Sequence, residues 1–383
     1  MSPLSPSDTT PRRLLNDVRL FEPTPLNDPL DELLQTHANA ETRPRRETPI
    51  ADDFAGRLHS YEILNQYVVG GQWRALALAS EASILETPAQ EENTLMKLWV
   101  YRVLALFSLR HYAGAEREMH RVELATGSAK VYTRAHRAPS VVWPFELRVL
   151  RAQCPGLARD DWPLSIERLS ALERACQRRI DKGTEVELNQ QRVLRLRLML
   201  ATCSLHLKDA ALATHILTSL ARTNDGDARL LSGVARVYLQ LGCITEAEQL
   251  FMRVEKSVPA DDKLAQMNRA LYAVATGKWE VARDLFTACC SGDSPEQRVA
   301  AANNAAVCEV YLGNPQSMLN QLQTLMESSP TAAGTSDELV FNYCTGLDLH
   351  YDGTRLREAK TKKMIEVGTW AGDGFNTSSF KIQ

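Results

Sequence analysis

The stretches RLMLATCSLHLKDAALATHIL (197–217) and LSGVARVYLQLGCITEAEQLF (231–251) align without gaps at an offset of 34 residues. Self-similarity at a fixed period of about 20 to 50 residues is typical of repeat proteins. Two further repeats follow in register, separated by one or two extra residues. The four repeats are 194–227, 228–261, 263–296 and 299–332.

Small and large side chains recur at fixed places in these repeats. The twentieth position is alanine in the first three repeats and Met318 in the fourth, and the twenty-fourth is always Leu or Phe. Small residues let two helices approach closely, and the large residue fills the space toward the next repeat. This spacing is typical of the tetratricopeptide repeat. The eighth position is alanine in all four repeats: Ala201, Ala235, Ala270 and Ala306.

The turn between the two helices of each repeat carries a second signal. Gly242, Gly277 and Gly313 occupy the turn position, with Lys208 in the first repeat. Glycine adopts the left-handed backbone that ends many helices. Pro259 and Pro330 close the second and fourth repeats, because proline cannot continue a helix. We therefore predict an all-α fold, an α-solenoid of tetratricopeptide helix-turn-helix repeats.

The flanking sequence divides the rest of the chain. Residues 1–57 hold eight of the seventeen prolines, so we predict a disordered, Pro-rich N-terminal arm. Within it, PLDELLQTH (29–37) has helical leucine spacing, and both a docking helix and a weakly populated helix are open interpretations. Residues 58–190 read as degenerate helical repeats, with an insertion near 127–145. Residues 191–383 hold the four repeats, followed by C-terminal capping helices and a tail.

Composition limits the classes of partner. The chain has 383 residues, of which 44% are apolar and 24% charged, and its net charge is −3. No global positive field attracts nucleic acid or an anionic membrane. The apolar runs are far shorter than the roughly 20 residues of a membrane span, and the first residues lack the apolar stretch of a secretory signal. We expect neither nucleic acid nor a direct membrane span, and membrane association only through partners.

Signatures of catalysis and metal binding are missing from the sequence. It contains no H-E-x-x-H, zinc-type Cys/His spacing, G-x-S-x-G or phosphate-loop pattern. The eight cysteines form no C-x-x-C pair, and we expect reduced thiols. Cys203, Cys289 and Cys308 occupy packing positions, which favours core thiols over nucleophiles, although the Cys289–Cys290 pair leaves a redox role as the alternative. We predict no catalytic residue, no cofactor and no metal.

A repeat stack offers a long concave surface for partners. The first helix of each repeat lines that surface, mainly through its second, fifth, ninth, twelfth and thirteenth positions. These polar and partly basic side chains suit an extended or acidic peptide. The alternative is that they are merely solvated and that the back face or the insertion binds. The predicted groove residues are Arg195, Thr202, His206, Arg229, Ser232, Arg236, Gln240 and Asn303.

The C-terminal half resembles one family more than tetratricopeptide proteins in general. LLSGVARVYLQLGCITEAEQLFMRVEK (230–256), AANNAAVCEVYLGN (301–314) and GDGFNTSSFKIQ (372–383) are similar to the subunit 12 family of the transport protein particle (TRAPP) tethering complex. VVWPFELRVLRAQ (141–153) fits the same family. The resemblance extends over about 60–383 and is strongest from 190 onward.

The resemblance implies a non-catalytic scaffold subunit of a TRAPP III-type complex, joined to the large arm subunit (subunit 11). The assembled complex activates a Rab1/Ypt1-type GTPase in ER-to-Golgi transport, Golgi organisation and autophagy. This implies a cytoplasmic protein, peripheral at the ER-Golgi intermediate compartment and the Golgi. No site residue carries over from the family. The alternatives are a generic tetratricopeptide co-chaperone or peptide-binding adaptor, and an enzyme with an unrecognised site. The carboxylate clamp of a co-chaperone is poorly matched, because Thr202 and Arg236 stand at the ninth positions and Asn303 stands alone.

Overall fold

A computed structural model describes residues 14–127, 141–259, 261–291 and 295–382. All regular secondary structure in these ranges is helical, which confirms the predicted all-α class. None of these described helices is both long enough and apolar enough to cross a lipid bilayer.

The chain forms two compact units. Unit 1 comprises the described residues up to 26 together with those of 48–184, and unit 2 comprises 27–47 and the described residues from 185 onward. The helices of unit 1 are η1 (Val18–Leu20), η2 (Ala51–Asp53), α2 (Tyr61–Val69), α3 (Trp73–Glu86), α4 (Glu92–Ser108), α5 (Tyr112–Thr126), α6 (Phe145–Arg159) and α7 (Trp162–Asp181). Those of unit 2 are α1 (Pro29–His37), α8 (Val186–His206), α9 (Ala210–Thr223), α10 (Ala228–Gln240), α11 (Ile244–Ser257), α12 (Lys263–Ala275), α13 (Trp279–Cys289), α14 (Pro295–Tyr311), α15 (Pro315–Ser328), α16 (Asp337–His350), α17 (Gly353–Trp370) and η4 (Thr377–Phe380).

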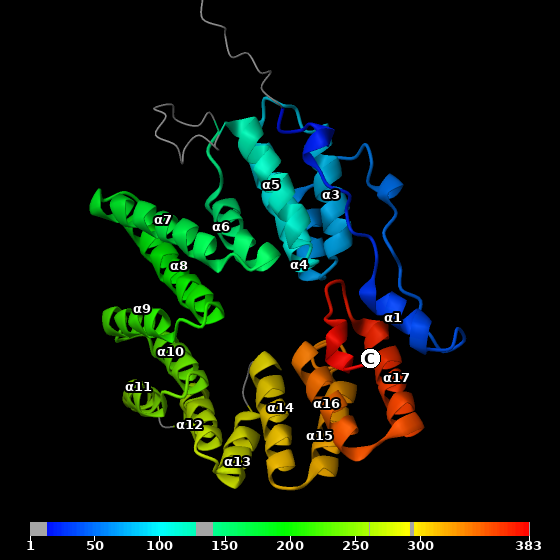
Figure 1. The fold of residues 1–383 in the computed structure, drawn as a ribbon, viewed down its shortest axis with the longest axis vertical. Coiled ribbons are helices and arrows are strands. Elements are labelled where there is room, and N and C mark those ends of the chain that lie inside the picture. Colours follow the sequence, from blue (N-terminus) through cyan, green and yellow to red (C-terminus); the bar gives the residue numbers. More distant parts are fainter. Residues whose placement is uncertain (1–13, 128–140, 260, 292–294, 383) are drawn as a thin grey trace, which may run out of the picture. The chain divides into compact units, whose positions relative to one another are not determined.

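Unit 2 is a stack of helix hairpins (Figure 1). The pairs α8–α9, α10–α11, α12–α13 and α14–α15 fall on the four predicted repeats, and each pair packs on the next. The alanines at the eighth position are buried at the helix crossings. Leu217, Phe251, Phe286 and Leu322 are buried between the helices. The small and large positions therefore act as the repeat pattern predicts, and the fold is a tetratricopeptide-type α-solenoid.

Turn residues and caps set the ends of these helices. Gly242, Gly277 and Gly313 have positive φ angles of 76°, 72° and 84°, and Lys208 adopts the same conformation at 59°. The αL backbone is thus kept in the first repeat although a side chain must be accommodated there. Aspartates cap the helix starts by accepting backbone N–H bonds: Asp209 for α9, Asp227 for α10 and Asp262 for α12.

The sequence predicts a disordered arm over residues 1–57, but this prediction is wrong for residues 14–57, several of which are buried in the structure. Leu15 and Leu20 are buried in unit 1, whereas Leu30 and Leu34 on α1 are buried in unit 2. A composition poor in apolar residues indicates disorder because such a segment cannot bury enough apolar surface by itself. The leucines of residues 14–57 are instead buried against helices from later in the chain, so this composition does not leave the segment disordered. Residues 1–13 lie outside the described residues.

The docking alternative for residues 29–37 is the one that the structure contains. Asp28 caps α1, and α1 packs on α17. The Arg46 guanidinium joins the two by an ion pair to Asp28 at 2.6 Å and hydrogen bonds to the carbonyls of Gly368 and Ala371. Glycine favours this close approach, because a Cβ at residue 368 would lie 2.8 Å from a Leu34 methyl group and would force that side chain to shift.

The remaining predicted boundaries shift by a few residues. The division between the units falls at 184/185 rather than 190/191, because α8 begins at Val186, well before the first repeat at 194. The predicted degenerate repeats of 58–190 contain the helices α2 to α7. Of the predicted insertion near 127–145, residues 128–140 lie outside the described residues.

Candidate functional site

The first helices of the second, third and fourth repeats line a groove in unit 2. It encloses about 690 Å³. Its floor is the apolar face of α12, and polar side chains reach it from α10 and α14. We call it the repeat groove; its lining residues are Arg236, Leu239, Gln240, Lys263, Leu264, Met267, Leu271, Val274, Ala275, Cys289, Gln297, Ala300 and Asn304.

A polar cluster under one side of the repeat groove positions Arg236. The guanidinium Nη2 of Arg236 and the hydroxyl of Ser232 both donate to Oδ1 of Asn268, at 3.2 and 2.7 Å. Asn268 is fully buried, and its Nδ2 has no hydrogen-bond partner among the described residues. Burial lowers the pKa of Arg236. Arg236 is therefore held in place at the groove by the neutral side chain of Asn268.

Lys263 brings a second positive charge to the groove wall. Its ammonium group donates to Gln266 Oε1, the Ala288 carbonyl and Ser291 Oγ, at 3.1 to 3.2 Å. Together with Arg236 it supplies the charged side chains among the described lining residues. An apolar floor beside two cations suits an extended segment that carries both apolar and acidic side chains.

The structure divides the eight predicted groove residues into three groups. Arg236 and Gln240 line the repeat groove, and Ser232 lies buried behind them, bonded to Asn268. Asn303 is only 8% exposed, and its Oδ1 accepts a hydrogen bond from Asn342 Nδ2 on α16 at 2.9 Å. Its neighbour Asn304 lines the groove instead. Consecutive helix residues point about 100° apart, so one step along α14 exchanges a packing contact for a groove position.

The other four predicted residues are exposed but do not line this groove. Arg195, Thr202 and His206 lie along α8, and Arg229 lies in the first turn of α10. Thr202 Oγ1 donates back to the Leu198 carbonyl at 3.1 Å, which is a local helix bond. The ninth position is therefore a groove residue in the second repeat (Arg236) and a solvent-exposed residue in the first (Thr202).

Position counting missed Lys263, Gln297 and Asn304 of the repeat groove. The first two lie in the opening turns of α12 and α14, just before or at the start of the predicted repeats. The sequence does contain a signal for Lys263. It directly follows Asp262, a residue type that often caps helices, and so lies in the first turn of a helix. The paired asparagines gave no such signal, because the sequence alone does not fix the rotation of α14.

The thiols of the chain have the environment of packing groups. All eight cysteines are free, and Cys203, Cys289 and Cys308 are buried, as predicted. Burial raises the pKa of Cys308 to about 11 and those of Cys154 and Cys344 to about 12. A thiol with so high a pKa is protonated at neutral pH and is a poor nucleophile. Across the described ranges, no cluster of three or more His, Cys, Asp or Glu side chains is placed to hold a metal ion.

Comparison with curated proteins finds two relatives, both named trafficking protein particle complex subunit 12. The mouse protein (Mus musculus) is 28% identical over 325 residues, which is 77% of this chain and 40% of the relative. The human protein (Homo sapiens) is 26% identical over 317 residues, which is 75% of this chain and 42% of the relative. The chain thus spans less than half the length of these relatives. The resemblance predicted from the C-terminal motifs is confirmed.

Comparison with solved structures concerns the fold. The crystal structure of Ypp1 is 11% identical with a TM-score of 0.51, over 92% of this chain and 53% of that one. The crystal structure of yeast Tom70 has a TM-score of 0.36 at 11% identity, over 80% of this chain and 79% of that one. No protein-family model matches the chain.

Proposed function

We propose that this chain is a non-catalytic scaffold subunit of a trafficking protein particle complex. The observation that carries the proposal is the 28% identity over 325 residues to a protein named as subunit 12 of such a complex. The helix hairpins of unit 2 support it, because a repeat stack exposes a long surface for neighbouring subunits. The buried, protonated thiols give no support to a nucleophilic enzyme.

The finer proposal is a place in a TRAPP III-type complex, beside the large arm subunit (subunit 11). That complex activates a Rab1/Ypt1-type GTPase in ER-to-Golgi transport, Golgi organisation and autophagy. In this proposal the chain supplies no chemistry to the exchange reaction. Other subunits hold it at the cytoplasmic surface of the ER-Golgi intermediate compartment and the Golgi.

The repeat groove is the proposed contact with a neighbouring subunit. Arg236 and Lys263 stand beside the apolar side chains of Leu264, Met267 and Leu271. Opposite charges at such a surface favour the rate and specificity of association, while burial of the apolar floor supplies affinity. We therefore propose an extended segment with acidic and apolar side chains as the groove's ligand.

Affinity purification of the tagged chain from its own cells, with mass spectrometry of the recovered proteins, tests two proposals. One is that the chain is a subunit of the complex, and the other is that it lies beside the large arm subunit. We expect the other complex subunits, including the large arm subunit. Recovery of a chaperone alone would favour the co-chaperone alternative, and recovery of no partner would contradict the scaffold proposal.

A matched pair of variants then tests the groove. Gln240→Glu with Asn304→Glu places two negative charges in the repeat groove, where they repel an acidic ligand. Gln316→Glu with Gln321→Glu places the same groups on the exposed face of α15. We expect the first variant to lose a complex subunit and the second to keep all of them. Equal recovery from both variants would exclude the groove as the contact while leaving the scaffold proposal in place.

A further inference from the structure

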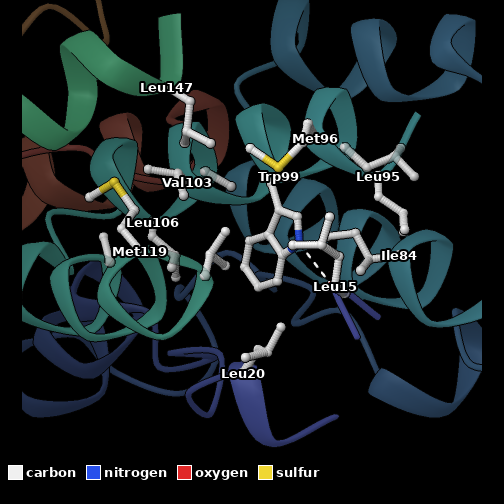
Figure 2. Close-up of a cluster of buried hydrophobic side chains, with 14 of the residues drawn as sticks. Leu15, Leu20, Ile84, Leu95, Met96, Trp99, Val103, Leu106, Met119 and Leu147 are labelled. Carbon is white, nitrogen blue, oxygen red and sulfur yellow. Dashed lines mark hydrogen bonds between the residues drawn. The ribbon is translucent and has the colours of Figure 1, made fainter. Parts of the chain in front are cut away.

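Residues 14–26 (LLNDVRLFEPTPL) lie on α3, α4 and α5 of unit 1, and side chains of these helices hold their backbone. The indole N–H of Trp99 donates to the Leu15 carbonyl at 3.1 Å, drawn as the dashed line in Figure 2. Arg121 donates to the Phe21 carbonyl at 3.0 Å, and Arg102 donates to the Glu22 carbonyl at 2.9 Å. Contacts from protein side chains to the main chain of an extended segment are how peptide-binding sites gain affinity.

Apolar side chains of the segment occupy defined pockets. Leu15 and Leu20 are buried in the cluster around Trp99, where Figure 2 shows both of them beside its ring. Phe21 stacks on Trp99, with the ring centroids 4.8 Å apart and the planes at 15°. The Arg102 guanidinium lies over the Phe21 ring at 5.5 Å. The segment is therefore anchored by two leucines and an aromatic ring.

Charged groups recognise the residues that follow the aromatic ring. The Glu22 carboxylate pairs with Arg117 at 3.0 Å and with Arg121, while its backbone N–H donates to Glu118 Oε1 at 2.9 Å. Arg102 donates to Thr24 Oγ1 at 2.6 Å. The side chains at 20–22 and 24 each have a partner of matching chemistry, so the site is complementary to the sequence Leu-Phe-Glu-X-Thr.

Charged side chains form part of this contact, which is unusual for an apolar core. Arg102, Arg117, Arg121 and Glu118 are charged groups that water hydrates well once a ligand leaves. A surface that can be solvated in this way tolerates an empty state, which a wholly apolar core does not. The segment is also a short one-turn helix and extended chain, not a member of a helix hairpin.

We propose that α3, α4 and α5 form a binding site for an extended Leu-Phe-Glu-X-Thr peptide, and that residues 20–24 are its resident, exchangeable ligand. The resident segment is tethered to the same chain, so its effective concentration is roughly millimolar. A free peptide of the same sequence then competes poorly with the intact chain and binds well only when the resident segment is weakened.

The test uses the full chain and a fluorescein-labelled peptide with the sequence of residues 14–26, followed by fluorescence anisotropy. The chain with Phe21→Ala and Glu22→Ala should bind the peptide saturably and about tenfold more tightly than the unmodified chain does. A peptide with the same two substitutions should bind about tenfold more weakly. Adding Arg121→Ala to the weakened chain should also reduce binding.

The matched control is the chain with Val18→Ala and Arg19→Ala, two exposed positions of the same segment. It should bind the peptide no better than the unmodified chain. Hydrogen exchange across α3–α5 completes the test. The proposal is overturned if the weakened chain stays folded without binding the peptide. It is equally overturned if Phe21→Ala with Glu22→Ala unfolds these helices, because the segment would then be part of the core.

Discussion

Arg102 on α4 and Glu118 on α5 form an ion pair at 2.6 Å in which both side chains are fully buried. Water is excluded by residues 14–26, whose Glu22 backbone bonds to both partners: Arg102 to its carbonyl and Glu118 to its N–H. A buried pair of this kind adds little net stability, yet losing one partner leaves an uncompensated charge. The segment therefore covers the Arg102–Glu118 pair, and water can reach this pair when the segment leaves.

Replacing Arg102 with methionine should destabilise unit 1 by about 3–5 kcal/mol, because Glu118 would remain buried without its partner. Urea unfolding, with hydrogen exchange to locate the loss in α3–α5, measures the effect. Arg117→Met is the control, since the Arg117 side chain is half exposed and a surface ion pair contributes about 0–1 kcal/mol. Equal losses in the two variants would contradict the buried-pair account.

Ala235→Trp and Ala306→Trp should each overpack a helix crossing of unit 2 and cost on the order of 1–3 kcal/mol or more. Both alanines are fully buried. Gly233→Trp is the matched control, because it puts the same side chain two residues away on α10, where a Cβ meets no atom within 4 Å. Thermal unfolding compares the three chains. Unchanged stability in both alanine variants would refute the repeat register.

Lys208→Gly should raise the free energy of unfolding by about 0.5–1 kcal/mol. Lys208 has a φ of 59° at the turn where the next three repeats carry glycine. A side chain in this region strains the backbone, and removing it outweighs the added freedom of the unfolded chain. Gly242→Ala, at the equivalent turn of the second repeat, should shift stability in the opposite direction. Thermal unfolding of both variants settles whether the two turns are equivalent.

Leu34→Ala should weaken the docking of α1 on α17 by about 2–5 kcal/mol, because Leu34 is fully buried against the α17 cluster. Hydrogen exchange of residues 29–37 reports the change directly. Glu32→Ala, an exposed change on the same helix, serves as the control and should leave exchange unchanged. The docking of α1 is wrong if exchange of residues 29–37 is already fast in the unmodified chain.

Acid should weaken unit 2 partly through Asp348. Burial raises the pKa of Asp348, but hydrogen bonds from Lys360 and Lys381 lower it by more, so this pKa lies below its ordinary value of 3.8. The ionised carboxylate therefore stabilises the fold above that ordinary value, and this contribution is lost as pH falls through the lower, folded pKa. Thermal midpoints between about pH 6 and 3 should fall less steeply in Asp348→Asn than in the unmodified chain. If the thermal midpoints of the two chains fall equally with pH, Asp348 does not contribute to the acid sensitivity of unit 2.

The repeated hairpins were predictable because their information is local. Alanine at the crossing and glycine at the turn each act within a few residues, and every hairpin contacts mainly its neighbours. Ala235 and Gly242 accordingly have the environments that their spacing predicts. Groove positions were less predictable, since they depend on helix rotation. One step along α14 separates the buried Asn303 from Asn304 in the groove.

The fate of residues 14–47 was decided only by the tertiary structure. By composition this segment resembles a disordered arm, and apart from the leucine spacing of 29–37 nothing periodic marks its contacts. Leu15 bonds to Trp99 across 84 residues, and Arg46 bonds to Gly368 across 322 residues. Such contacts exist only after distant helices have assembled into a surface that is already low in entropy. Periodic local signals therefore fix the helices and their pairing, whereas the partner of a short non-periodic segment depends on surfaces that form when the chain folds.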